Sequence, residues 1–115
     1  MKVLVTGCAG LIGSNFCKWL SDKAEIIGVD DLSGGVDVPP NIKFVQANLT
    51  EPEDQKRVAE CFPVDYVFHF AAYAAEGLSP FIRQYNYKNN LVATAFLVSE
   101  SIRHKVKRFV FTSSM

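Results

Sequence analysis

The sequence predicts an α/β fold built on a doubly wound parallel sheet of five strands. Five short runs rich in β-branched and aromatic residues alternate along the chain with segments of helical spacing. Parallel strands need a crossover between them, and this alternation supplies one after each strand. The expected strand order is 3-2-1-4-5, which is typical of doubly wound sheets.

The strands are predicted where a short β-rich run lies between turn residues. These runs are Lys2–Thr6, Glu25–Val29, Lys43–Gln46, Asp65–Phe70 and Lys107–Thr112.

The helices are predicted from apolar spacing and from capping residues. The first covers Leu11–Ser21. The second begins at Thr50 as N-cap, with Glu53 as its capping-box partner, and ends near Cys61. The third opens with Ser79-Pro80 and continues, with a break near Tyr85–Tyr87, to about His104. Five helix side chains are expected to pack against the sheet: Phe16, Trp19, Val58, Phe96 and Ile102.

The composition is that of a single globular domain. The chain has 115 residues, 49% of them hydrophobic, which is enough apolar material for its own core. Its 12 basic and 12 acidic residues balance, so no nucleic acid and no membrane surface is indicated as a partner. Neither a signal peptide nor a membrane span is predicted. The three cysteines, Cys8, Cys17 and Cys61, include no Cys-x-x-Cys pair, so we expect a cytoplasmic protein with reduced thiols and no metal site.

A glycine-rich turn joins the first strand to the first helix. Gly7, Gly10 and Gly13 follow a Gly-x-x-Gly-x-x-Gly spacing, one residue longer than the dinucleotide fingerprint of Rossmann folds. Gly7 can take the turn, Gly10 leaves room for a pyrophosphate, and Gly13 lets the helix lie close to the sheet. The helix N-terminus would then face the phosphates. Taken alone, the same turn could simply join a strand to a helix and bind nothing.

An acidic residue at the end of the second strand favours the binding interpretation. Asp30 lies 23 residues after Gly7, close to the spacing of about 20 residues expected for a ribose-binding carboxylate. Such a carboxylate accepts hydrogen bonds from the ribose hydroxyls and repels a 2′-phosphate, and no arginine follows it closely. The sequence therefore predicts NAD rather than NADP as the cofactor. The alternative is that Asp30 is a solvated turn residue.

Six segments together resemble a known family. In order they are TGCAGLIG, VDDLSGG, ANLT, VFHFAAYAA, NNLVAT and RFVFTSS. They are similar to the N-terminal part of the extended short-chain dehydrogenase/reductases, in particular the NAD-dependent nucleotide-sugar epimerases and dehydratases that are like UDP-glucose 4-epimerase. The resemblance covers essentially the whole chain. It implies an incomplete NAD-binding Rossmann domain over residues 1–115, truncated before the later strands and the C-terminal substrate domain.

The resemblance also assigns roles to individual residues. It implies a pyrophosphate loop, an adenosine-ribose acid with its neighbouring loop, a pair that flanks the adenine, and a segment that passes under the cofactor. In that order, these are Gly7, Gly10, Leu11, Ile12 and Gly13; Asp30 with Asp31, Leu32 and Ser33; Asn48 and Leu49; and Phe70, Ala71, Ala72 and Tyr73. Asn90 matches the asparagine that braces the last segment, with Asn89 as its rival, and Ser114 matches the catalytic Ser/Thr.

Three side chains in these motifs are open to more than one interpretation. The family usually has Asp where this chain has Asn48, whose amide oxygen could still accept from the adenine amino group. Cys8 is either a small packing residue or an oxidisable thiol whose pKa the helix N-terminus lowers. His69 is expected to be a core histidine with satisfied hydrogen bonds rather than a catalyst.

The chemistry of the resembled enzymes needs a Tyr-x-x-x-Lys pair, in which the tyrosine is the general base. None of Tyr66, Tyr73, Tyr85 and Tyr87 has a lysine four residues on, so the chain alone is expected to be inactive. The resemblance implies a homo-oligomeric parent enzyme, a dimer, that passes hydride from a nucleotide-sugar hydroxyl to NAD.

A non-catalytic dinucleotide-binding sensor or scaffold of the same fold is the alternative function. The hydroxyl of Ser114 argues against it, because a sensor does not need that group. The apolar helix before the fifth strand and the open edge of that strand also lead us to expect that the isolated chain self-associates.

Overall fold

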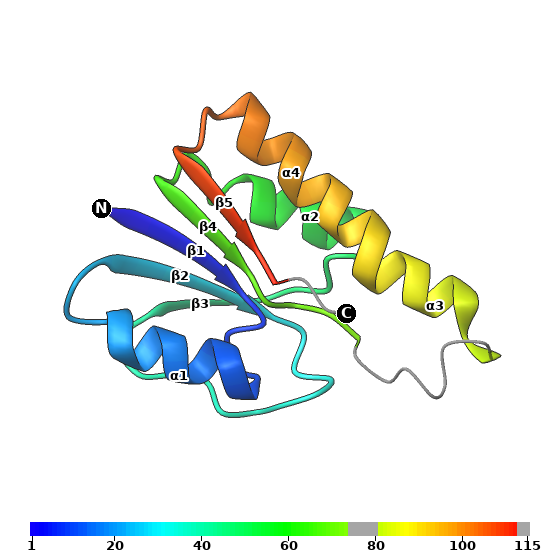
Figure 1. Ribbon diagram of the computed structural model, residues 1–115, viewed down its shortest axis with the longest axis horizontal. Helices are drawn as coiled ribbons and strands as arrows, with labels where there is room; N and C mark the ends of the chain where they lie inside the picture. Colours follow the sequence, from blue (N-terminus) through cyan, green and yellow to red (C-terminus); the bar gives the residue numbers. More distant parts are fainter. Residues whose placement is uncertain (74–80, 113–115) are drawn as a thin grey trace.

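The computed structural model describes residues 1–73 and 81–112 and contains one five-stranded sheet (Figure 1). All pairings are parallel and the order is β3-β2-β1-β4-β5, which confirms the predicted fold class. The strands are β1 (Lys2–Thr6), β2 (Glu25–Asp30), β3 (Lys43–Gln46), β4 (Tyr66–His69) and β5 (Arg108–Phe111).

Helices cover both faces of this sheet (Figure 1). α1 (Leu11–Leu20) lies on one face, and α2 (Pro52–Ala59) and α4 (Ala93–Arg103) lie on the other. A short helix, α3 (Arg83–Tyr87), and a π-helical turn, η2 (Lys88–Val92), lead directly into α4. Within the described part of the chain, no helix has the length and apolar character needed to cross a membrane.

The alternation of side chains along the strands fills two separate cores. The core beside α1 contains Val3, Val5, Cys8, Cys17, Leu20 and Ile26. The core beside α2 and α4 includes Leu4, Ile27, Val58, Val67 and Leu97. Because successive residues of β1 point to opposite faces, this one strand anchors both cores.

Two of the helix residues expected to pack against the sheet face solvent instead. Trp19 is 60% exposed and Ile102 is 73% exposed. On α1 the inward face is taken by Cys17 and Leu20, and on α4 by Leu97. Both helices carry apolar residues on overlapping faces, so their spacing alone could not tell which face turns inward.

The second helix begins one residue later than predicted, at Pro52. The N–H and the hydroxyl of Thr50 both donate to Asn48 Oδ1, at 3.0 and 2.6 Å. Glu51 is the N-cap, and Pro52 takes the first helical position, where its fixed φ is already suitable. The predicted capping box of Thr50 and Glu53 is therefore wrong, because an asparagine two residues earlier captures the Thr50 hydroxyl.

The irregularity in the third helical segment lies after the predicted place. α3 runs through Tyr85–Tyr87 without a break, and the distortion is the π-helical turn over Lys88–Val92. The predicted start at Ser79-Pro80 lies outside the described residues.

The carboxyl ends of all five strands lie at one edge of the sheet. From β1 the chain proceeds to β2 and β3 on one side, and β4 and β5 lie on the other. A topological switch point therefore lies between β1 and β4, and ligands of doubly wound folds bind outside the strand ends at such a point.

Candidate functional site

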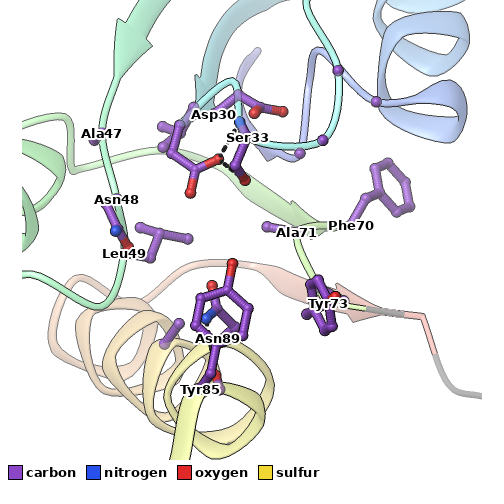
Figure 2. A pocket seen from close by; sticks show the side chains of 18 residues that line it. Asp30, Ser33, Ala47, Asn48, Leu49, Phe70, Ala71, Tyr73, Tyr85 and Asn89 are labelled. Atoms are coloured by element: carbon purple, nitrogen blue, oxygen red, sulfur yellow. Dashed lines mark hydrogen bonds between the residues drawn. The ribbon is translucent and has the colours of Figure 1, made fainter. Parts of the chain in front are cut away.

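A cavity of about 320 Å³ opens at this carboxyl edge (Figure 2). Its walls are the turn after β1, the loops after β2 and β3, the segment after β4, and one face of the helix that leads into α4. The lining residues are Gly7, Gly10, Val29, Asp30, Asp31, Ser33, Gly34, Gly35, Ala47, Asn48, Leu49, Phe70, Ala71, Ala72, Tyr73, Tyr85, Asn89 and Ala93.

The fold thus brings together most of the residues that the sequence singled out. Five others lie next to the cavity lining in the chain or behind it: Leu11, Ile12, Gly13, Leu32 and Asn90. Ser114 lies outside the described residues.

The turn after β1 uses glycine where a side chain would not fit. Gly7 has a φ of 71°, in the left-handed region, and a Cβ there would lie 2.8 Å from the Ala71 nitrogen. A Cβ on Gly13 would overlap the carbonyl oxygen of Gly7. Glycine at these two positions therefore lets α1 begin directly against the turn and lets the turn lie against the segment after β4.

The start of α1 is an uncapped helix N-terminus. Its N-cap is Gly10, which has no side chain to bond the first amides, and its first turn contains no acidic residue. The Ser14 N–H donates to the Gly10 carbonyl (2.9 Å), so the amides of Leu11, Ile12 and Gly13 precede the first intrahelical bond. These amides and the positive end of the helix dipole suit an anionic group.

Asp30 connects the loop after β2 to the glycine turn. Its Oδ2 accepts from the Ala9 N–H (3.0 Å), and its Oδ1 accepts from the Leu32 N–H (2.8 Å). The carboxylate is therefore held in place at the cavity wall and is not a freely solvated turn residue. Each carboxylate oxygen can accept a second hydrogen bond, so both remain able to bind a ligand hydroxyl.

The neighbouring loop residues shape the same wall. Asp31 Oδ1 accepts from the Ser33 N–H (2.9 Å) and the Ser33 hydroxyl (2.6 Å), as the dashed lines in Figure 2 show. Leu32 between them has a φ of 65° and is not part of the lining. This arrangement turns the side chains of Asp31 and Ser33 toward the cavity.

Asn48 offers a ligand a different group from the one expected. Its Oδ1 already accepts two hydrogen bonds from Thr50, and because the Thr50 N–H can only donate, the amide orientation is fixed. Both bonds use the oxygen that was expected to accept from an adenine amino group, and that contact stays a prediction. What Asn48 has left is its NH₂ donor, beside the Leu49 side chain in the same wall.

Asn90 braces the segment after β4, as the resemblance implies. Its Oδ1 accepts from the Tyr73 N–H (2.6 Å), and its Nδ2 donates to the Tyr73 carbonyl (2.8 Å) and to Asn86 Oδ1 (2.8 Å). Asn89, its rival, instead lines the cavity and donates to the Tyr85 carbonyl (2.9 Å). The two adjacent asparagines of η2 thus have separate positions, one behind the wall and one in it.

Two lining residues of the helical wall, Tyr85 and Ala93, were not singled out as site residues, and Asn89 was named only as the rival of Asn90. Tyr85, Asn89 and Ala93 are spaced four residues apart, so they share one helix face. Figure 2 shows the Tyr85 ring reaching from the helix into the middle of the cavity, and it meets the Tyr73 ring edge-on at 5.0 Å. A spacing of four residues predicts that they share a helix face, but it does not say which face turns toward the cavity.

Two titratable side chains near the site are buried. Burial raises the pKa of the Cys8 thiol to about 12, so the interpretation of Cys8 as a thiol with a lowered pKa is wrong and packing is its role. Burial lowers the pKa of His69 to about 4, which keeps the ring neutral. His69 has a hydroxyl partner at each ring nitrogen, so it is the satisfied core histidine that was expected.

The chain matches a known protein family and several of its characterised members. Residues 3–115 match the model of the NAD-dependent epimerase/dehydratase family. UDP-glucose 4-epimerase of Bacillus subtilis is 35% identical over 99% of the chain, and dTDP-D-glucose 4,6-dehydratase of Dictyostelium discoideum is 31% identical over 98%. The chain spans 37% and 29% of the lengths of these two relatives.

Solved structures superpose closely on the chain. The UDP-glucose 4-epimerase of Thermotoga maritima, determined with UDP-glucose, has a TM-score of 0.91 and 33% identity over 99% of the chain. The Thermus thermophilus UDP-glucose 4-epimerase, determined with NAD, has a TM-score of 0.90 and 31% identity over 99% of the chain. The chain covers 38% of each. Since the family model matches nearly the whole chain and the fold agrees, this chain belongs to the NAD-dependent epimerase/dehydratase family.

Proposed function

We propose that this chain is the NAD-binding portion of a nucleotide-sugar epimerase or dehydratase. The observation that carries the proposal is that the N-terminal end of α1, at Gly10, and the Asp30 carboxylate line one cavity. A dinucleotide needs both an anion site for its pyrophosphate and an acceptor for its ribose hydroxyls, next to each other at the carboxyl edge of the sheet. Membership of the family and the NAD complex of the Thermus thermophilus relative support the assignment.

Each wall of the cavity would bind a different part of NAD. The amides of Leu11, Ile12 and Gly13 would bind the pyrophosphate, and Asp30 would accept from the adenosine ribose hydroxyls. The adenine would lie between Leu49 and the Tyr85–Ala93 helix face, with the Asn48 NH₂ group at its edge. Phe70 to Tyr73 would carry the nicotinamide half toward the end of β5.

NAD supplies a hydride acceptor, and later a hydride donor, to the sugar carbon that bears the reacting hydroxyl. We propose that Ser114 donates a hydrogen bond to that hydroxyl oxygen, while a tyrosine of a Tyr-x-x-x-Lys pair elsewhere in the parent enzyme accepts the hydroxyl proton. The keto sugar formed is then reduced on its other face, or loses water first. The chain described above contributes the binding and orientation of the cofactor.

Cofactor preference tests this proposal. We expect NAD to bind more tightly than NADP, because the Asp30 carboxylate repels a 2′-phosphate. Asp30→Ala should weaken NAD binding by about tenfold or more, since it removes charge-assisted hydrogen bonds, and should narrow the gap between the two cofactors. Isothermal titration calorimetry with both dinucleotides measures each affinity.

Asp22→Ala is a matched control, because it removes another carboxylate from the chain. Asp22 is an exposed carboxylate in the turn between α1 and β2, paired with Lys23 at 3.0 Å and away from the cavity. Asp22→Ala should leave both affinities unchanged. Tighter binding of NADP than of NAD by the unmodified chain would reject the assignment.

A further inference from the structure

His69, the last residue of β4, sits between two hydroxyl groups inside the fold. Its Nδ1 lies 2.6 Å from Thr6 Oγ1, and its Nε2 lies 2.8 Å from Thr94 Oγ1. The residue is 1% exposed and is not part of the cavity lining. The rings of Phe109 and Phe111 flank it, with centroids at 6.0 and 6.2 Å, so its only polar contacts in the described part of the chain run through these two threonines.

The hydrogen-bond partners of Thr94 fix which ring nitrogen carries the proton. The Thr94 hydroxyl donates to the Asn90 carbonyl (2.9 Å), and a carbonyl can only accept. Thr94 Oγ1 has one hydrogen, so toward His69 it must act as an acceptor. His69 therefore carries its proton on Nε2, and this proton is donated to Thr94.

The other side of the ring follows from the same accounting. With the proton on Nε2, Nδ1 of the neutral ring is an acceptor, and the Thr6 hydroxyl donates to it. Thr6 Oγ1 in turn accepts from the Ala71 N–H (3.2 Å). Burial lowers the pKa of His69 to about 4, which agrees with a neutral ring at physiological pH.

Both ends of this hydrogen-bond chain reach the walls of the cavity. Thr6 directly precedes Gly7 of the glycine turn, and it holds the backbone of Ala71. At the other end, the residue whose carbonyl accepts from Thr94 is Asn90, whose side chain bonds both backbone groups of Tyr73. One ring thus connects the turn after β1, the segment after β4 and the helix that carries Tyr85, Asn89 and Ala93.

We propose that His69 is a positioning residue for the dinucleotide cavity: its Nε2-protonated ring links Thr6 to Thr94 and so fixes the spacing of three cavity walls. The proposal rests on the proposed NAD site, because the spacing matters only if a ligand must contact the walls together. Any buried imidazole needs a hydrogen-bond partner at each ring nitrogen, so the two hydroxyls alone do not separate this role from a place in the core. What separates the two roles is whether the loss of one of these hydrogen bonds weakens the binding of the dinucleotide.

Thr94→Val is the variant that separates these two roles. Valine has nearly the shape of threonine but leaves the His69 Nε2–H without an acceptor. We expect the NAD dissociation constant to rise by about tenfold, which corresponds to the loss of one buried hydrogen bond. Thr94→Ser retains the hydroxyl while removing a methyl group, and it should keep the affinity of the unmodified chain.

Ser101→Ala is a matched control on the same helix. Ser101 is buried, and its hydroxyl donates to the carbonyl four residues earlier, Leu97, at 2.7 Å, just as Thr94 does to Asn90. It has no contact with the His69 ring. The substitution removes a buried hydroxyl hydrogen bond, so it should lower the melting temperature of the chain. It should leave the NAD dissociation constant unchanged.

Long-range ¹H–¹⁵N NMR spectra of the imidazole give a readout that does not depend on any variant. In the unmodified chain at neutral pH we expect the shifts of a neutral ring protonated on Nε2. A ring protonated on Nδ1, or a charged ring, would overturn the hydrogen-bond chain as described.

The affinity measurements separate the remaining outcomes. If the unmodified chain binds no dinucleotide, the proposed function falls and the positioning role falls with it. If the unmodified chain binds NAD but Thr94→Val binds it equally well, or if Thr94→Ser weakens binding as much as Thr94→Val does, the positioning role alone is wrong. Circular dichroism of each variant establishes that the comparison is between folded chains.

Discussion

At the residue scale, burial controls the chemistry of the thiols near the proposed site. Cys8 and Cys17 belong to the core beside α1, and burial raises their pKa values to about 12 and 11. Burial also raises the pKa of Cys61. The thiolate is the reactive form, so a shift of three pKa units reduces its population about a thousandfold. We predict that none of these thiols reacts rapidly with Ellman's reagent in the folded chain at neutral pH.

The same preparation unfolded in urea is the control for this prediction. It should release color for all three cysteines at the rate of free thiols, because unfolding removes the burial that raised their pKa values. Fast labelling of Cys8 in the folded chain, located by mass spectrometry of tryptic peptides, would contradict the packing role.

The buried ring of His69 makes stability depend on pH. It titrates near pH 6.5 when unfolded, whereas burial lowers its pKa to about 4 in the folded chain. Between these values the unfolded chain binds a proton that the folded chain does not bind, so the free energy of unfolding rises with pH. The His69 contribution is complete above pH 6.5 and is lost as the pH falls toward 4, by at most about 3 kcal/mol.

Urea titrations over this pH interval measure the effect. Carboxylates also titrate there, so the informative quantity is the difference between the unmodified chain and His69→Gln, which lacks the titrating group. The unmodified chain should lose more stability than His69→Gln as the pH falls from neutral to about 5. Parallel pH profiles for the two proteins would show that His69 is not held neutral by burial.

At the scale of the elements, the fold could be predicted because each strand carries its own local signal. The run Lys2–Thr6 ends directly at Gly7, and Asp30 ends the second run at the spacing of a ribose acid. Local signals gave the wrong helix boundary where a competing side chain determines the position at which the helix begins. The start of α2 depends on Asn48 capturing Thr50, a choice that the capping pattern does not contain.

The candidate site likewise contains residues that the sequence could locate and residues that it could not. Gly7 and Asp30 belong to motifs with a fixed spacing, so the sequence located them. Tyr85 and Asn89 depend on which helix face turns toward the sheet edge, and the π-helical turn η2 alters that register. The partners of His69 lie 63 and 25 residues away along the chain, so no local pattern could reveal them.

The outward face of the helix before β5 carries an apolar stripe. Leu91 of η2 and Ala95, Val98 and Ile102 of α4 are exposed, and the three residues of α4 are spaced by three and four residues, as in the seam of a coiled coil. Leu97 is fully buried, so this stripe is separate from the face that packs on the sheet. We predict that the 115-residue chain self-associates, with the stripe of one copy packed on that of another.

Ile102→Lys tests the stripe, because it places a charge at its most exposed large residue. Sedimentation velocity should show a shift toward monomer for this variant. Val36→Lys is the control, since Val36 is 79% exposed but lies in the loop after β2. A monodisperse monomer of the unmodified chain at tens of micromolar would contradict the prediction.

At the scale of the whole molecule, the proposed function allows cofactor binding to be tested separately from proton transfer. The chain spans 35% to 38% of the first epimerase relatives and structures that it matches. Its described residues include a helix N-terminus without a side-chain cap and a carboxylate, both at one cavity, which we propose bind the pyrophosphate and a ribose of NAD. Binding of NAD and turnover of a sugar can therefore be measured as independent properties of this chain.

We predict that the 115-residue chain binds NAD but does not turn over UDP-glucose, the ligand in the Thermotoga maritima structure. Removal of a hydroxyl proton needs a positioned base, and no tyrosine here has a lysine four residues on. Tyr85 reaches the cavity, but the fourth residue after it is Asn89, and His69 is buried with both ring nitrogens bonded. A coupled assay for UDP-galactose, run on a sample whose NAD affinity has been measured, tests this. Turnover abolished by Tyr85→Phe would identify the Tyr85 hydroxyl as a base that the family spacing does not require.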